Sequence, residues 1–147
     1  MAESRTISPV QRPTKKSAIY IMGFSLFCSV VVLDIIFFDD FVKPSNVNNF
    51  NIIGKTNEIL SSYNKGVFSH LIIGVGYDHM QERANFFNKF YKKIPFANLI
   101  HSSCIIGSNV DLGQGNVFYP GVIIDANVKI ENNVLINLGC TISHNSI

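Results

Sequence analysis

His144 is the residue of this sequence best suited to proton transfer. It stands in the segment Ser143-His144-Asn145, close to the end of the chain. An imidazole titrates near neutral pH, so a histidine can take a proton from an amine or hydroxyl group as that group attacks a substrate. We therefore interpret His144 as a candidate general base, with an inert surface histidine as the competing interpretation.

Two adjacent carboxylates provide a second candidate site. Asp39 and Asp40 lie at the end of the apolar run 35–41. Neighbouring side chains of a strand point to opposite faces, so this pair suits hydrogen bonds to a ligand better than shared acid–base work. A solvated strand end explains the pair equally well. Gly76 ends another apolar run, 70–76, and would gather with the carboxylates if both runs are parallel strands.

Other kinds of site find little support in the sequence. Gly-Val-Gly at 74–76 would need a third glycine at position 79 for a dinucleotide fingerprint, and His79 stands there. His70 and His79 have no partner at metal-ligand spacing, so no metal site is predicted. The net charge of +2, from 12 basic and 10 acidic residues, is too small for the clustered phosphate contacts of nucleic-acid binding.

The chain has 147 residues, of which 47% are apolar, so it has enough apolar side chains to form a core around the elements that position these residues. Residues 1–16 are expected to be a flexible leader. Strand, turn and helix then alternate, which is typical of a small, Rossmann-like parallel α/β domain. The expected elements are a strand at 18–22, a turn at Gly23, a helix from near Ser25, a strand at 35–41, a turn at 49–55 with Gly54, a strand at 70–76, and a helix at 78–93 whose apolar face holds Met80, Ala84, Phe87 and Tyr91.

The run 17–33 allows a different interpretation. It contains 17 uncharged, mostly apolar residues directly after Lys15 and Lys16, as in a signal sequence or short membrane anchor. A spanning helix needs about 20 apolar residues, and Asp34 interrupts this run. We favour a buried strand and helix, and membrane anchoring is the alternative.

A strict six-residue repeat begins at Ile100. The first position of each hexad is a large apolar residue in every case, and the fifth is small or β-branched in nearly all. This period is a signature of the parallel β-helix. Each hexad makes one short strand and one corner, three hexads close a triangular coil, and coils stack about 4.8 Å apart. The first position is then expected to fill the interior, with glycine and asparagine at the corners.

The repeat also makes predictions about the cysteines and about the end of the chain. Cys104 and Cys140 stand 36 residues apart, so they would lie two coils apart, about 9.6 Å, and remain free thiols. With Cys28 they are interpreted as small core residues in a reducing compartment, and a cytoplasmic location is expected. The hexads stop partway through a coil at Ile147, so we expect an incomplete solenoid whose last edge is covered by a partner, or else a fragment.

Several segments together resemble the left-handed β-helix sugar acetyltransferases of the PglD and NeuD family. The resemblance extends from about Lys16 to the end of the chain. It rests on KKSAIYIMGFS, FFDDF, IIGVGYD and NLIHSSCIIGSNV, and above all on VLINLGCTISHNSI.

This resemblance implies a nucleotide-sugar-binding α/β domain at 17–97 and a trimeric β-helix from 98 to 147. Acetyl-CoA would bind between neighbouring solenoids as co-substrate. Acetyl would pass to a nucleotide-linked amino sugar or a sialic acid in surface-glycan biosynthesis. Because later coils are missing, impaired activity is expected, and a non-catalytic remnant or sugar-nucleotide-binding module is the alternative.

The resemblance also assigns roles to single residues. His144 falls on the family's general base, and Asn145 stands where the family has an acidic residue. The positions that contact the sugar nucleotide in the family correspond here to Ser25, Asp39, Asp40 and Gly76.

Overall fold

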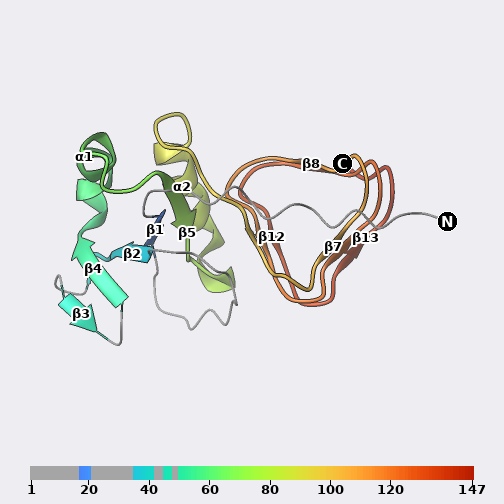
Figure 1. Ribbon diagram of the computed structural model, residues 1–147, viewed down its shortest axis with the longest axis horizontal. Coiled ribbons are helices and arrows are strands. Elements are labelled where there is room, and N and C mark those ends of the chain that lie inside the picture. Colours follow the sequence, from blue (N-terminus) through green and yellow to red (C-terminus); the bar gives the residue numbers. More distant parts are fainter. Residues whose placement is uncertain (1–16, 21–34, 42–44, 48–49) are drawn as a thin grey trace.

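A five-stranded sheet forms the N-terminal part of the structure, a computed structural model that describes residues 17–20, 35–41, 45–47 and 50–147. β1 (Ser17–Tyr20) pairs in parallel with β2 (Ile35–Phe38) on one side and with β5 (His70–Ile73) on the other. β2 also pairs in parallel with β4 (Phe50–Gly54), and β3 (Ser45–Val47) pairs with β4 in the antiparallel direction. The strand order is therefore β3-β4-β2-β1-β5 (Figure 1).

Three of these strands agree with the sequence-based expectation. The predicted strands at 18–22, 35–41 and 70–76 are confirmed by β1, β2 and β5, but β2 ends at Phe38 and β5 at Ile73, before the predicted ends. The predicted turn at 49–55 is wrong, because residues 50–54 form β4. β4 obtains its ladder bonds from β2 and β3, which a local pattern does not reveal. The turn at Gly23 and the helix from Ser25 lie outside the described residues.

Two helices pack on this sheet. The first, a 3₁₀ turn at Thr56–Glu58 followed by α1 (Ile59–Asn64), was not expected from the sequence. The second, a 3₁₀ turn at Tyr77–His79 followed by α2 (Met80–Phe90), confirms the helix predicted at 78–93. Its buried face differs from the prediction, since Met80 is 44% exposed. The buried residues of α2 are Arg83, Phe87 and Phe90.

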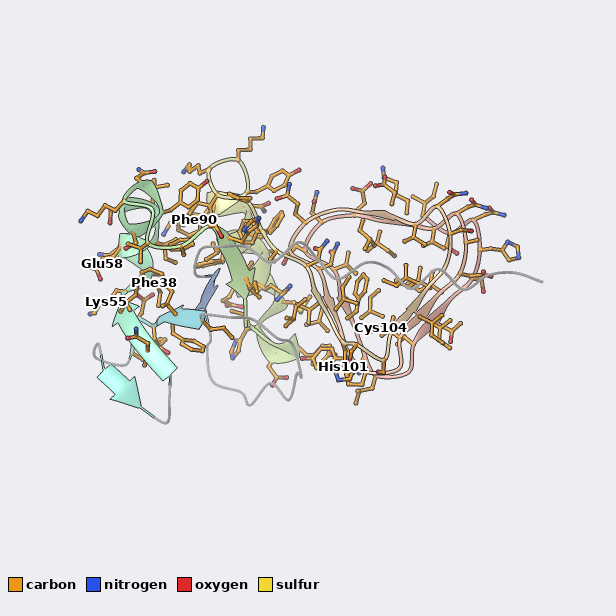
Figure 2. All side chains as sticks on the ribbon, in the orientation of Figure 1. Phe38, Lys55, Glu58, Phe90, His101 and Cys104 are labelled. Carbon is orange, nitrogen blue, oxygen red and sulfur yellow. The ribbon has the colours of Figure 1, made fainter. Side chains whose placement is uncertain are left out.

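Aromatic residues dominate the core between the sheet and these helices. Phe38 packs edge-on against Phe68, with ring centroids 5.8 Å apart. Phe90 belongs to the same buried cluster, together with Ile59 of α1 and Leu71 of β5 (Figure 2). Burial of side chains of this size stabilises the fold by about 1.5–3 kcal/mol each, which fixes both helices on the sheet.

Residues 99–142 form a solenoid of two-residue strands spaced six residues apart. The strands are β6 (Leu99–Ile100), β7 (Ile105–Ile106), β8 (Asp111–Leu112), β9 (Val117–Phe118), β10 (Ile123–Ile124), β11 (Lys129–Ile130), β12 (Leu135–Ile136) and β13 (Thr141–Ile142). Ile105 pairs with Ile123, and Ile123 pairs with Thr141, all in parallel. One coil therefore contains 18 residues, as the hexads predict, and Figure 1 shows the coils as stacked three-sided loops.

The interior and the corners of the solenoid follow the hexad. First-position residues such as Phe118, Ile124 and Ile130 form its core. Positive φ angles recur every six residues, between 56° and 75°, at Asn109, Gly115, Gly121, Asn127, Asn133, Gly139 and Asn145. Glycine and asparagine tolerate this left-handed conformation better than other residues do, so both parts of the prediction are confirmed.

The prediction of free thiols in the solenoid is confirmed, but the prediction that both cysteines are core residues is wrong for Cys140, which is exposed. Cys104 and Cys140 are free thiols. Cys104 is half-buried beside His101 at one corner of the first coil, where its Sγ lies 3.2 Å from the carbonyl oxygen of Tyr119 (Figure 2). Desolvation of this thiol raises the pKa of Cys104. Cys28 lies outside the described residues.

The segment 17–33, for which membrane anchoring is the alternative, lies outside the described residues from position 21 onward. None of the helices among the described residues has the length and apolar character needed to cross a bilayer.

Candidate functional site

The carboxyl ends of β2 and β5 gather the predicted sheet residues along one edge. Because β1, β2 and β5 run in parallel, Asp39 and Asp40 after β2 and Gly76 after β5 lie on the same side of the sheet. The backbone N–H of Asp39 donates to the carbonyl of Gly54, 3.0 Å away, which ties this edge to β4. Ser25, the fourth predicted sugar-nucleotide contact, lies outside the described residues.

The two aspartates have different partners. Oδ1 of Asp39 accepts a hydrogen bond from the N–H of Phe41 at 2.7 Å, so it shapes the turn after β2. Both carboxylate oxygens of Asp40 bind Thr56, Oδ1 its backbone N–H at 2.9 Å and Oδ2 its hydroxyl at 2.7 Å. Asp40 thus stabilises the start of the Thr56–Glu58 turn across 16 residues of sequence.

Gly76 begins the 3₁₀ turn that leads into α2. A Cβ atom added there would meet none of the described residues within 4 Å, so the described part of the chain leaves room over this backbone. Tyr77 follows, half exposed, and stacks on Tyr119 of the solenoid with ring centroids 6.2 Å apart. Partial burial raises the pKa of Tyr77, and the neighbouring Tyr119 and Cys140 add to the rise. This end of β5 therefore combines accessible backbone with an aromatic pair.

His144 lies on the solenoid, in the turn after β13, and is exposed. Its Nδ1 is 3.1 Å from the side-chain nitrogen of Asn145. An unprotonated Nδ1 accepts from this amide, and a protonated Nδ1 can donate to the amide oxygen once the amide turns over. Asn145 itself has φ 59° and continues a row of left-handed asparagines, Asn109 and Asn127, from the two coils before it.

The other histidine of the solenoid, His101, is part of a turn. The N–H of Ser103 donates to Nδ1 of His101 at 3.2 Å, and the hydroxyl of Ser103 lies 2.8 Å from the same atom. That hydroxyl also accepts from the N–H of Gly121 in the next coil, at 3.0 Å. These bonds fasten the first corner of the solenoid to the second coil, which gives His101 a structural role.

Metal-ligating groups do not gather in the described part of the chain. No three side chains of the histidine, cysteine, aspartate or glutamate type come together there in a way that could hold a metal ion.

One buried residue at the junction of the sheet and the solenoid was not predicted from the sequence. Arg83 of α2 is completely buried and donates to the carbonyl oxygens of Ile73, Val75 and Gly115. A signal for it was present, since Arg83 precedes Phe87 by one helical turn and shares its face. Without the structure, a basic residue on an amphipathic helix is more readily placed in solvent.

Comparisons with known proteins identify the fold. No family model and no curated protein matches the sequence. Among solved structures, the acetyltransferase domain of PglB from Neisseria gonorrhoeae superposes with a TM-score of 0.67 and 22% identity over 88% of this chain. A mutant of perosamine N-acetyltransferase from Caulobacter crescentus, in complex with CoA and GDP-perosamine, gives 0.66 and 21% over 90%. WeeI from Acinetobacter baumannii gives 0.65 and 16% over 90%.

The chain spans 65% of the length of each of these three structures. The superposition covers both the sheet part and the solenoid, since it includes about nine tenths of the chain. The resemblance to sugar acetyltransferases with a β-helix is thus confirmed at the level of the fold.

Proposed function

We propose that this chain belongs to an acetyl-CoA-dependent acetyltransferase that modifies a nucleotide-linked amino sugar or a sialic acid in surface-glycan biosynthesis. The observation that carries the proposal is the combination, in one chain, of a sheet with four parallel strands and a solenoid with an exposed histidine. The similar structures from Neisseria gonorrhoeae and Caulobacter crescentus, described as acetyltransferases, support it.

The sheet part, 17–97, is proposed to act as a Rossmann-like unit that binds the nucleotide sugar. Ligands of parallel sheets bind at the carboxyl ends of the strands, where Asp39 and Gly76 lie. The room that the described residues leave over Gly76 would let a phosphate or a sugar hydroxyl approach backbone N–H groups. Asp40 would support this site indirectly, because both of its oxygens already bind Thr56. Ser25 is retained as a proposed contact from the resemblance.

The solenoid, 98–147, is proposed to hold the acceptor amine and acetyl-CoA beside His144. Acetyl-CoA is the second substrate and supplies an activated acetyl thioester. The imidazole of His144 would take a proton from the amine as its nitrogen bonds to the acetyl carbon and the carbon–sulfur bond breaks. For Nε2 to be the base, Nδ1 must carry the ring proton. The Nδ1–H group would then donate a hydrogen bond to the amide oxygen of Asn145. The proton finally leaves with the CoA thiol.

A homotrimer is the proposed assembly, and the outer faces of the solenoid favour it. The outward residues of β6 and β9, Leu99 and Val117, are buried within the chain. Those of β8 and β11 are charged. On the third face, Ile105 and Ile123 stack in register while 62% and 39% exposed. A stacked pair of exposed isoleucines fits a contact with a second copy better than it fits solvent.

The test is acetyl transfer to GDP- or UDP-linked amino sugars, measured as release of free CoA thiol. The assay uses the 147-residue chain and a version extended with the later coils of the PglB acetyltransferase domain. We expect His144→Ala to lower turnover by about 10²- to 10⁴-fold while leaving nucleotide-sugar binding, measured by calorimetry, nearly unchanged. Ser108→Ala is the matched control, because Ser108 stands at the same turn position two coils earlier and should have no effect.

Each alternative outcome is informative. Full turnover in His144→Ala would refute the assignment of the base. Binding of nucleotide sugar without any turnover in either version would favour a binding module over a transferase.

A further inference from the structure

Arg83 is a cation in the interior of the molecule. Its exposed fraction is 0%. Burial lowers the pKa of Arg83 to about 10, so the guanidinium is still charged at neutral pH. The ion pairs found among the described residues lie elsewhere, at His79–Glu82 and Lys129–Glu131. A buried charge is costly unless it is well solvated by polar groups, so the groups that surround Arg83 need an explanation.

The partners of Arg83 are backbone carbonyls from two parts of the chain. Nη1 donates to Ile73, at 2.8 Å, and to Val75, at 3.3 Å, which together form the carboxyl end of β5. Nη2 donates to Gly115, at 2.9 Å, in the solenoid corner between β8 and β9. The planar, rigid guanidinium therefore connects the end of β5 to the first coil in a fixed geometry.

Other contacts across this junction involve different elements. Gly115 approaches α2 so closely that an added Cβ would lie 3.0 Å from the ring of Phe87. The side chain of Asn132 donates to the hydroxyl of Tyr91 at 3.4 Å. These contacts hold the solenoid to α2 and to the residue that follows it.

The start of β5 is tied to the solenoid through Phe96, which bridges to Leu71 and whose N–H donates to Oε1 of Gln114 at 3.1 Å. At the carboxyl end of β5, Arg83 and the stacked pair of Tyr77 and Tyr119 make the contacts with the solenoid that the described residues show.

We propose that Arg83 is a positioning residue that locks the carboxyl end of β5 onto the first coil, and thereby fixes the orientation of Gly76 and Tyr77 relative to the solenoid. Gly76 follows directly after one of its acceptors, Val75, and Tyr77 is the next residue. Where the proposed function holds, this lock sets the position of the nucleotide sugar relative to the acetyl-transfer site. The consequence for catalysis rests on the proposed function, whereas the lock itself does not.

The direct test measures the sheet-to-solenoid distance in solution. Spin-labelled non-natural amino acids at Lys65, exposed after α1, and at Glu131, exposed in the second coil, leave the cysteines untouched. Double electron–electron resonance should give one narrow distance distribution in the unaltered chain. Arg83→Lys and Arg83→Met should broaden or shift it, because neither side chain can bind both carbonyl sets. Lys89→Met, on the exposed face of the same helix, is the matched control and should change nothing.

A narrow, unshifted distribution in folded Arg83→Met would overturn the proposal. If neither Arg83 variant folds, hydrogen exchange on the unaltered chain decides. The lock requires the amides of residues 74–77 and 115–118 to become exposed in one common opening event. Exchange of the two segments through separate openings of different free energy would contradict it.

A second readout separates positioning from stability. At a temperature where Arg83→Lys is fully folded, its affinity for the nucleotide sugar should fall on the order of tenfold, with acetyl-CoA binding unchanged. An unchanged affinity beside a lower melting temperature would show a purely structural role. If the unaltered chain binds no nucleotide sugar, the proposed function fails, and the distance measurement still tests the lock.

Discussion

Two separate requirements act on Asn145, one from its place beside His144 and one from its backbone conformation. By resemblance to sugar acetyltransferases, Asn145 is expected to take the place of an acidic residue next to the proposed base, His144. The structure adds a backbone requirement, since its φ of 59° continues the left-handed corners of Asn109 and Asn127. Asparagine and aspartate both tolerate this conformation, so the corner by itself does not explain the choice between them.

The corner predicts a stability effect at Asn145. Asn145→Ala should lower the free energy of unfolding by about 1–2 kcal/mol, because alanine carries the full steric cost of the left-handed conformation. Asn145→Gly should be nearly neutral, and urea denaturation followed by circular dichroism distinguishes the two. Equal stability of the alanine variant and the unaltered chain would contradict the argument.

Residue types in the sequence were enough to propose His144, Asp39 and Gly76, but not to describe their partners. The bidentate binding of Thr56 by Asp40 spans 16 residues and could not be foreseen from a local pattern. Arg83 shares the helix face of Phe87, but its hydrogen-bond partners were equally hidden, because they are backbone carbonyls, which every sequence contains.

At the scale of elements, the solenoid was the predictable part and α1 was not. A hexad places the same residue type at the same structural position many times, so its signal accumulates along the chain. The six-residue helix α1 has no such repetition. It depends on the burial of Ile59 and on Asp40 upstream. The sequence analysis also missed β4, because the strands that it pairs with lie elsewhere in the sequence.

A row of asparagines inside the solenoid predicts a further stability effect. Oδ1 of Asn98 accepts the N–H of Asn116 at 2.9 Å, and Oδ1 of the fully buried Asn116 accepts the N–H of Val134 at 2.7 Å. Asn116→Val should leave the Val134 donor without a partner and lower the free energy of unfolding by about 1–3 kcal/mol.

The control for this prediction is Asn109→Gly. It removes an exposed bond to Asn127, 3.2 Å long, and keeps the left-handed backbone. Its effect should stay within about 0.5 kcal/mol. Equal urea midpoints for Asn116→Val and the control would show that the row contributes nothing.

At the scale of the whole molecule, the outer faces of the solenoid make the proposed trimer testable. Ile123→Lys would place a charge between the stacked isoleucines of two copies, so light scattering after gel filtration should give the mass of one copy instead of three. Lys129→Ala, on the charged face where Lys129 pairs with Glu131 at 2.7 Å, should keep the mass of the unaltered chain. A trimeric mass for Ile123→Lys would exclude this face as the interface.

Assembly and the junction of the two parts are what the sequence revealed least. The hexads indicated a triangular coil but not which of its sides is covered, charged or bare. That distinction depends on the packing of Leu99 and Val117 inside the chain and on the exposure of Ile105. Such differences arise from where the sheet and α2 dock, which is a property of the folded molecule.

The register of the coils also limits how the gene can change in length. Strands pair with strands 18 residues away, as Ile105 does with Ile123. Insertion or deletion of eighteen codons within the repeat would move everything downstream by one full coil. Each side chain would then stay on its own wall, that is, on the same one of the three faces of the solenoid. Six codons would preserve every corner but turn the following segment by one wall of the prism, carrying His144 around to a different side. Twelve codons would do the same by two walls, and a number that is not a multiple of six would break the corners themselves, so length changes that keep each side chain on its own wall should come in multiples of eighteen.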